Sequence, residues 1–305
     1  MIETSVLLPA YNAEKYISQC IKSILAQDYK NYEIIIIDDN STDHTADIIK
    51  SIKDERILYI RNKRNLGIVG SLNSGLRLAK GEFISRMDAD DVMLGNRLKE
   101  QTEFLKIHPE VGMVGSHYLL ITDFGRIIGT HLVSIDPDFL KFNLLFRNQF
   151  AHSSISIRKS LLLKLKYRSK YLYNEDYDLW CRVAKVTKIA NLEALHLAYR
   201  LHSTNTCSLN QQVLKTNVIS LLSGQLKKMG IKHSVDDLRI HAAICFGYGI
   251  KYFNTDEKKN QLITWLDKIF NHSALKNYNS RDLSYYRQYV LEHYCGFVVD
   301  ANASE

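Results

Sequence analysis

The first 87 residues alternate between two spacings of hydrophobic positions. Short apolar runs, which are typical of buried strands, lie at 5–8, 32–37, 57–60 and 83–87. Between these runs the apolar residues recur at the spacing of one helix face. Strands and helices that follow one another in this order predict a mainly parallel, doubly wound α/β sheet with right-handed crossovers.

Polar residues mark where we expect the three intervening helices to begin or end. Asn12 and Ser41 are good N-cap residues for the first and second helices. The third helix would run from about Ile68 to Ala79, with Gly81 near its C-cap. If Ser41 is a cap, no ligand is needed to explain it.

The pattern changes after residue 110 and again near residue 207. Strands are predicted at 111–121, 153–158 and 194–201, with one helix at 177–186, and amphipathic helices follow to the end of the chain. We therefore expect an α/β domain over 1–206 and a helical region over 207–305. Because no Pro- or Gly-rich linker separates them, we expect the helices to pack on the first domain. The predicted C-terminal helices lie at 213–229, 235–253, 257–270 and 282–299.

Three polar clusters follow predicted strands: PAYN at 9–12, DDNSTD at 38–43 and DADD at 88–91. Open sheets of parallel strands bind ligands at the carboxyl ends of the strands. We expect the three clusters to line one crevice.

The DADD cluster places Asp88, Asp90 and Asp91 within four positions. Like charges this close raise one another's pKa, so a bound cation is the leading explanation. Continuation of the strand would give Asp88 and Asp90 the same side-chain parity. Oxygen ligands suit Mg²⁺ or Mn²⁺, which can also bridge a diphosphate. An acidic turn or a helix cap is the alternative, because an isolated DxD triplet is common.

Two other clusters carry candidate ligand-binding or catalytic groups. Asp39 follows a strand and can accept hydrogen bonds from a base N–H or from ribose hydroxyls. Tyr11 can stack on a flat ring or simply cover the core. In YNEDYDLWCR, Glu175 and Asp176 fall at a helix N-terminus, where the dipole favours ionised carboxylates. Such a carboxylate is a helix cap or a general base.

The amino-acid composition limits the class of protein and the cellular compartment that we expect. The 305 residues are 46% hydrophobic, enough for a full domain and an appendage, and no apolar run is long enough to span a membrane. The N-terminus has no signal-peptide pattern, and the five cysteines, Cys207 among them, form no CxxC pair, which fits a reducing cytoplasm. Residues 141–170 carry eight Lys or Arg and no Asp or Glu. This run is a solvated basic face or attracts phosphate-bearing substrates or anionic lipid, and no nucleic-acid partner is expected.

Taken together, three segments resemble the inverting, GT-A-fold glycosyltransferases of family 2. They are LLPAYNAEKYISQCIKSILAQDYKNYEIIIIDDNSTDHT, RNLGIVGSLNSGLRLAKGEFISRMDADD and NEDYDLWCR, and they span roughly residues 4–205. The resemblance implies a Rossmann-like GT-A domain, with Asp176 as catalytic base beside Glu175, and Asp90 as ligand of Mn²⁺ or Mg²⁺. His202 would complete the metal site or is only a histidine at a strand end. The nucleotide sugar would be held by Pro9, Ala10, Tyr11, Asn12, Asp38, Asp39, Asn65, Asp88 and Ala89.

The resemblance further implies a hexosyl- or N-acetylhexosaminyl-transferase. Its donor would be a nucleotide-diphosphate sugar, with a UDP-sugar favoured, and its acceptor a hydroxyl of a glycan or of a lipid-linked molecule. The basic segment 141–170 and the helical tail suggest, as a separate hypothesis, that the acceptor is anionic or lipid-linked at the inner membrane face. Many relatives carry an arginine where this chain has Ser71, Leu72 and Asn73, so recognition of the base stays open. The QxxRW signature of processive synthases is absent, which favours single addition. The alternatives are a catalytically silent nucleotide- or glycan-binding module and a sugar nucleotidyltransferase, although PAYNAEK lacks the glycine of a triphosphate loop.

Overall fold

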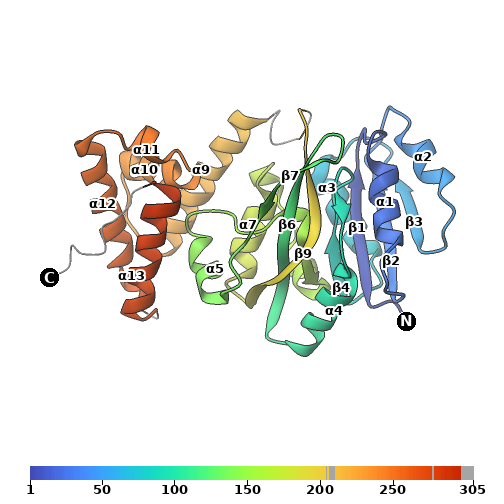
Figure 1. Ribbon diagram of the computed structural model, residues 1–305, viewed down its shortest axis with the longest axis horizontal. Coiled ribbons are helices and arrows are strands. Elements are labelled where there is room, and N and C mark those ends of the chain that lie inside the picture. The colour runs from blue at the N-terminus through green and yellow to red at the C-terminus, as the bar shows by residue number, and fades with distance from the viewer. Residues whose placement is uncertain (204, 206–209, 277, 297–305) are drawn as a thin grey trace. The chain divides into compact units, whose positions relative to one another are not determined.

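The computed structural model describes residues 1–203, 205, 210–276 and 278–296 (Figure 1). Contacts divide the chain into two compact units: Met1–Lys141 with Gln149–Gln211, and Phe142–Asn148 with Gln212–Glu305. The predicted boundary between residues 206 and 207 lies outside the described residues. The division into domains at that point therefore stays a prediction.

The first unit is built on the four strands that the apolar runs predict. They are β1 (Thr4–Ala10), β2 (Tyr32–Asp38), β3 (Ile57–Arg61) and β4 (Phe83–Arg86), and they lie side by side in the order β3-β2-β1-β4, all parallel. Every residue of β1 and β2 is buried, as expected for parallel strands covered on both faces. The connecting helices are α1 (Ile17–Leu25), α2 (Thr45–Ser51) and α3 (Gly67–Leu78). The α/β prediction is confirmed here.

Beyond β4 the sheet becomes mixed (Figure 1). Strand β8 (Ser156–Arg158) runs antiparallel to both β4 and β6 (Val111–Thr122), and β6 is parallel to β9 (Lys188–Leu201). Two short strands pair antiparallel at the margins, β5 (Val92–Met93) with β9 and β7 (Ile127–His131) with β6. The remaining elements of this part of the chain are α4 (Arg97–Ile107), α5 (Pro137–Asn143), η1 (His152–Ser154), α6 (Lys159–Leu165), η2 (Ser169–Tyr171) and α7 (Glu175–Val183).

Two predicted helix caps are wrong. Helix α1 begins at Ile17 and α2 at Thr45, so neither Asn12 nor Ser41 caps a helix. The main chain of Asn12 is in the left-handed region, with φ of 47°. Its Oδ1 accepts the N–H of Thr42 at 2.8 Å, and its own N–H donates to Ser41 Oγ at 3.1 Å. The two side chains tie the loop after β1 to the loop after β2.

Gly81 is also not the C-cap that was predicted. Helix α3 ends at Leu78, and Ala79 after it is extended. A Cβ on Gly81 would lie 2.6 Å from the backbone nitrogen of Ser5. The glycine is needed because the chain passes directly against β1.

The second unit is helical, as the periodicity predicts. Glycines split the predicted helix 235–253 in two, since Gly247 and Gly249 have φ of 64° and 51°. The part of the predicted helix 282–299 beyond residue 296 lies outside the described residues. The helices are α9 (Gln211–Lys228), α10 (Val235–Cys245), α11 (Gly249–Tyr252), α12 (Asp256–Phe270), η3 (Ser273–Leu275), α13 (Ser280–Tyr289) and η4 (Val290–Tyr294).

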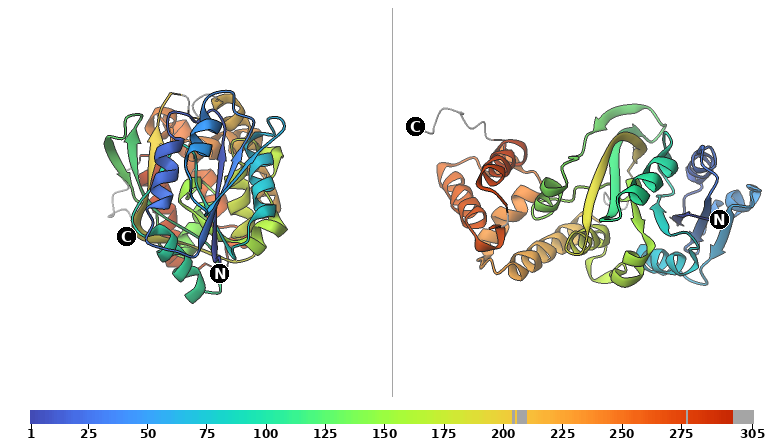
Figure 2. Two further views of the ribbon diagram at one scale, coloured as in Figure 1. Left: turned by 90° about the vertical axis from the view of Figure 1, so that its right-hand side faces the viewer. Right: turned by 90° about the horizontal axis from the view of Figure 1, so that it is seen from below.

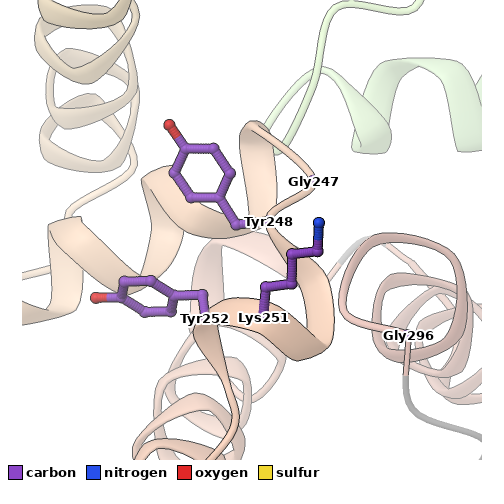
Figure 3. A pocket seen from close by; sticks show the side chains of 5 residues that line it. All are labelled: Gly247, Tyr248, Lys251, Tyr252 and Gly296. Atoms are coloured by element: carbon purple, nitrogen blue, oxygen red, sulfur yellow. The ribbon is translucent and has the colours of Figure 1, made fainter.

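A hollow of about 590 Å³ lies within this helical unit. Its lining residues are Gly247, Tyr248, Lys251, Tyr252 and Gly296 (Figure 3). None of them is a predicted site residue, and all of the predicted site residues belong to the first unit.

The described helices include none with the length and hydropathy that a membrane span requires. Four cysteines of the described residues are free and buried, and Cys207 lies outside those residues.

Candidate active site

The three carboxylates of the DADD cluster lie in a turn and not on the strand. Strand β4 already ends at Arg86, so the predicted shared parity of Asp88 and Asp90 is wrong. The turn nevertheless places one oxygen of Asp88, Asp90 and Asp91 within 4.8 Å of one another. Asp91 is 1% exposed, and burial together with the two neighbouring carboxylates raises its pKa well above the ordinary range. Its Oδ2 has no hydrogen-bond partner among the described residues.

Three buried arginines surround this turn and offset its negative charge. Arg86 forms an ion pair with Asp88, and the Arg200 guanidinium donates to the backbone oxygen of Asp90 at 2.7 Å. Arg97 is fully buried and donates to the backbone oxygens of Arg86 and Ile155 at 2.8 and 3.0 Å. Burial lowers the pKa of Arg97 to about 9, which still leaves it charged at neutral pH. The carboxylates are therefore held together in part by the protein's own cations.

His202 lies beside the cluster, after the end of β9. Its Nε2 is 2.9 Å from Asp90 Oδ2, and its ring centroid is 4.9 Å from that of Tyr16. Asn205 Nδ2 is 3.4 Å from the same Asp90 oxygen. The pair of residues that the sequence assigned to a metal, Asp90 and His202, is thus in direct contact.

Two of the predicted nucleotide-binding residues, Asp38 and Asp39, already accept hydrogen bonds from other groups of the protein. Asp38 accepts the N–H of Ser41 and the hydroxyl of Tyr59, each at 2.8 Å, and is fully buried. Asp39 Oδ1 accepts from Asn62 Nδ2 at 2.7 Å and from the N–H of Leu66 at 2.8 Å. Both aspartates therefore shape the loops at this edge of the sheet.

The other predicted nucleotide-binding residues divide between strand and loop. Pro9 and Ala10 are buried at the end of β1, whereas Tyr11 is 51% exposed on the loop that follows. Asn65 Oδ1 accepts the N–H of Gly67 at 3.0 Å, at the start of α3. Ala89 is buried within the aspartate turn. Tyr11, Asn12 and Asn65 are the exposed residues of this group.

Helix α7 begins with the two carboxylates that the sequence singled out. Glu175 is 6% exposed, and its Oε2 has no hydrogen-bond partner among the described residues. Burial, followed by the charge of Asp176, raises the pKa of Glu175 to about 7. Asp176 Oδ1 accepts the N–H of Tyr177 at 2.6 Å. Tyr173, just before the helix, has φ of 67°, a strained conformation for an aromatic residue.

Two neighbouring residues contact the aspartate turn and a buried tyrosine. Ser153 Oγ donates to Asp88 Oδ2 at 2.6 Å, and the neighbouring His152 Nε2 lies 2.9 Å from the hydroxyl of Tyr167. Burial raises the pKa of Tyr167, and the charges of Asp176, Glu175 and Asp88 raise it further. Carboxylates from both clusters therefore raise the pKa of one buried phenol.

The sequence analysis missed Arg86, Arg97, Arg200, Ser153 and Tyr167. A signal was available for Arg86, because FISR places a charged residue inside an otherwise apolar strand directly before the acidic cluster. Arg200 gives a similar signal within LHLAYRL.

Comparisons with known proteins agree with this geometry. The family described as "Glycosyl transferase family 2" matches residues 5–164, more than half of the chain. An uncharacterized glycosyltransferase of Haemophilus influenzae is 30% identical over 304 residues, covering 94% of this chain and 91% of the relative. The Escherichia coli protein named UDP-Glc:alpha-D-GlcNAc-diphosphoundecaprenol beta-1,3-glucosyltransferase WfaP is 32% identical over 247 residues, covering 80% of this chain and 91% of the relative.

Solved structures share the fold. Staphylococcus aureus TarS 1–349, in complex with UDP-GlcNAc, has a TM-score of 0.60 at 18% identity, covering 96% of this chain and 91% of that one. The mannosyltransferase PcManGT from Pyrobaculum calidifontis, in complex with GDP-Man and Mn²⁺, has a TM-score of 0.58 at 15% identity, covering 96% and 84%.

The protein is thus a glycosyltransferase with a GT-A fold. More closely, the chain belongs to glycosyltransferase family 2. The resemblance, the fold class and the enzyme class predicted from the sequence are confirmed. This outcome favours the transferase over the silent binding module and the nucleotidyltransferase.

The buried carboxylate of Glu175 predicts a pH-dependent stability. Its folded pKa of about 7 exceeds the ordinary 4.5, so the folded state holds the proton more tightly than the unfolded state. Stability is therefore lost as pH rises from 4.5 to 7. Glu175→Gln, which cannot ionise, should be more stable than wild type above pH 7 by roughly 1 to 3 kcal/mol, and this advantage should disappear near pH 4.5.

Urea unfolding at several pH values measures this difference. Glu193→Gln, which removes an exposed carboxylate from β9, is the matched control and should follow the wild-type curve. Parallel pH profiles for Glu175→Gln and wild type would refute the prediction.

Proposed function

We propose that the protein is an inverting glycosyltransferase that transfers a hexosyl or N-acetylhexosaminyl group from a UDP-sugar to a hydroxyl of a glycan or lipid-linked acceptor. The observation that carries this proposal is the convergence of Asp88, Asp90 and Asp91, which place one oxygen each within 4.8 Å of one another, in a chain that matches glycosyltransferase family 2. The names of two relatives, WfaP and WfgD of Escherichia coli, include UDP-Glc and a diphosphoundecaprenol acceptor, which supports the choice of donor and acceptor class.

The donor set of the aspartate turn fits a divalent metal. Three carboxylates converge there, and the buried Oδ2 of Asp91 is without a protein partner among the described residues, as expected where hard oxygen ligands serve Mn²⁺ or Mg²⁺. In this proposal Asp90 holds the ion, with His202 as a further ligand. When bound, the ion neutralises charge on the diphosphate leaving group. Asp88, Ala89, Tyr11, Asn12, Asp39 and Asn65 then form the surroundings of the nucleotide sugar, with Pro9, Ala10 and Asp38 supporting them from the strand ends.

Asp176 is the proposed general base. Its place in the first turn of α7 favours the ionised form, because the helix dipole is positive there. The carboxylate takes the proton from the acceptor hydroxyl, and the oxygen attacks the anomeric carbon as the bond to the diphosphate breaks on the opposite face. The configuration at that carbon is thereby inverted. Glu175, buried beside it, limits the negative charge at this position when it carries its proton.

Asp90→Ala tests the metal assignment. Because it removes a charged ligand, the variant should bind UDP in the presence of Mn²⁺ about ten- to a hundredfold more weakly, which corresponds to roughly 1.5–3 kcal/mol. Isothermal calorimetry with UDP and Mn²⁺ measures this change. Asp54→Ala is the control, since that aspartate pairs with Arg56 outside the proposed site, and wild-type affinity in Asp90→Ala would contradict the assignment.

The proposed class of acceptor is inferred from a group of exposed basic residues. Lys164, Lys166, Arg168 and Lys170 are exposed on and just after α6, within the segment that lacks acidic residues. This basic surface supports an acceptor that is anionic or lipid-linked, and a peripheral position of the enzyme at the cytoplasmic face of an anionic membrane. Replacing these four residues by glutamine should reduce the salt-sensitive part of binding to anionic vesicles.

A further inference from the structure

The turn between β6 and β7, together with β7 and the residues after it, exposes an unusual number of large apolar side chains. Single exposed apolar residues are common, but five between residues 124 and 135 form a local cluster. We call residues 123–135 the apolar hairpin. Its exposed apolar residues are Phe124 (90%), Ile127 (60%), Ile128 (54%), Leu132 (70%) and Ile135 (49%).

The hairpin exposes these side chains on both of its faces. Ile127 and Ile128 are consecutive in β7, so they point to opposite sides of the strand. Within the described residues β7 pairs with β6 alone and is not part of the main strand order of the sheet (Figure 2, green strand). A protein strand added at the free edge would pair with the backbone and cover neither face fully. A hydrocarbon boundary, in contrast, surrounds both faces at once.

The charges of the hairpin match an anionic lipid surface. Residues 123–135 include Arg126, His131 and one carboxylate, Asp123, which pairs with Lys15. Lys15, whose side chain is 55% exposed, lies with its Nζ 5.5 Å from the ring centroid of Phe124. Apolar side chains flanked by cations are typical of segments that seat in the headgroup region of anionic membranes.

The base of the hairpin is tied to the candidate active site. Asp123 accepts hydrogen bonds from Lys15 and from the hydroxyl of Tyr16. Arg200 donates to the backbone oxygen of Asp123 at 2.9 Å and also to that of Asp90 at 2.7 Å. A surface that binds the hairpin would therefore also fix the distance between the aspartate turn and that surface.

We propose that the apolar hairpin docks the enzyme on an anionic phospholipid membrane. Phe124, Ile127 and Ile128 lie at the boundary between headgroups and acyl chains, and Arg126 lies at the lipid phosphates. Because the backbone of an open strand edge cannot be satisfied in hydrocarbon, the hairpin stays in the interface and does not enter the hydrocarbon core. This proposal rests on the proposed function only in that docking would bring the site to a lipid-linked acceptor.

Phe124→Trp provides a direct probe. The native tryptophans, Trp180 and Trp265, are 0% and 1% exposed, so a change in emission on adding vesicles reports the new residue. We expect a blue shift, and quenching by brominated acyl chains, with vesicles of phosphatidylcholine and phosphatidylglycerol. Ile107→Trp, at the exposed end of α4, is the control and should show neither. Failure of brominated lipid to quench the tryptophan at position 124 would overturn the proposal.

Vesicle flotation supplies the second measurement. The triple variant Phe124→Ser, Ile127→Ser, Ile128→Ser should lose at least about tenfold in partitioning to anionic vesicles, equivalent to about 1.4 kcal/mol. The control Ile107→Ser, Val186→Ser removes apolar side chains that are exposed elsewhere in the same unit and should float like wild type. Unchanged flotation of the triple variant, or no flotation of wild type, would overturn docking by the hairpin.

Two further measurements separate this proposal from others. Calorimetry with UDP and Mn²⁺ should give the same affinity for the triple variant and for wild type. If wild type itself fails to bind UDP, the proposed function fails while the flotation result stands. A different outcome would be that wild type forms a dimer in sedimentation that the triple variant does not form, with no binding to vesicles. That result would show that the hairpin binds a second copy of the chain and not a membrane.

Discussion

An Asp176→Asn variant is expected to transfer sugar about a hundred- to ten-thousandfold more slowly than wild type, because an amide cannot accept the proton of the acceptor hydroxyl. The amide has nearly the same shape, so its oxygen can still accept the N–H of Tyr177 at the start of α7. Donor binding should therefore be preserved. Initial rates with a panel of UDP-, GDP- and TDP-sugars, followed by nucleotide release, measure the loss, and calorimetry with UDP measures binding.

Asp178→Asn is the matched control for this experiment. Asp178 lies on the same helix, but it pairs with Arg182 at 2.7 Å and has no place in the proposed chemistry. It should keep its transfer rate within a few fold. Wild-type turnover in Asp176→Asn would refute the assignment of the base. An equal loss in both variants would instead show that the rate depends on the integrity of α7.

The first half of the sheet could be predicted because its strands are almost uninterrupted aliphatic runs. Residues Ile34–Ile37, for example, are 0% exposed, and a parallel strand covered on both faces needs such a run. The helix starts could not be predicted from residue type alone. Asn12 and Ser41 have the chemistry of N-caps, but their hydrogen bonds join two loops that only the folded sheet brings together.

The second half of the sheet depends on contacts between distant residues. Strand β8 has three residues and pairs with two strands far away in the sequence. Strand β7 is exposed on both faces, so it lacks the alternation of apolar and polar residues that marks a half-buried strand. Helix α4 was missed, although it carries the arginine that stabilises the aspartate turn.

The carboxylates of the candidate site could be predicted from the sequence, but the buried arginines that surround them could not. Aspartates that directly follow a strand can be recognised by position, and the two residues at the start of α7 by helical periodicity. The buried cations around the turn come from residues 86, 97 and 200, and nothing in the spacing of those residues indicates that they converge. Their burial follows from the tertiary fold.

Arg97→Met is expected to destabilise the first unit by roughly 3–5 kcal/mol, the usual result of breaking a buried network of charges and hydrogen bonds. The arginine is fully buried and donates to backbone oxygens of Arg86, Ser153 and Ile155. Methionine fills similar space but removes the three hydrogen bonds that the guanidinium donates to these carbonyls. It also removes a positive charge that offsets the buried carboxylate of Asp91.

Unfolding in urea, followed by the fluorescence of Trp180, tests this prediction, because that tryptophan lies in the first unit. A Trp265→Phe background removes the signal of the second unit. Arg97→Lys should fall between methionine and wild type, since an ammonium keeps the charge but cannot reach as many carbonyls in a fixed plane. Lys99→Met, on the exposed face of α4, is the control. If Arg97→Met unfolds within about 1 kcal/mol of wild type, the aspartate turn does not depend on this cation, and the charges of Arg86 and Arg200 alone must offset the carboxylates.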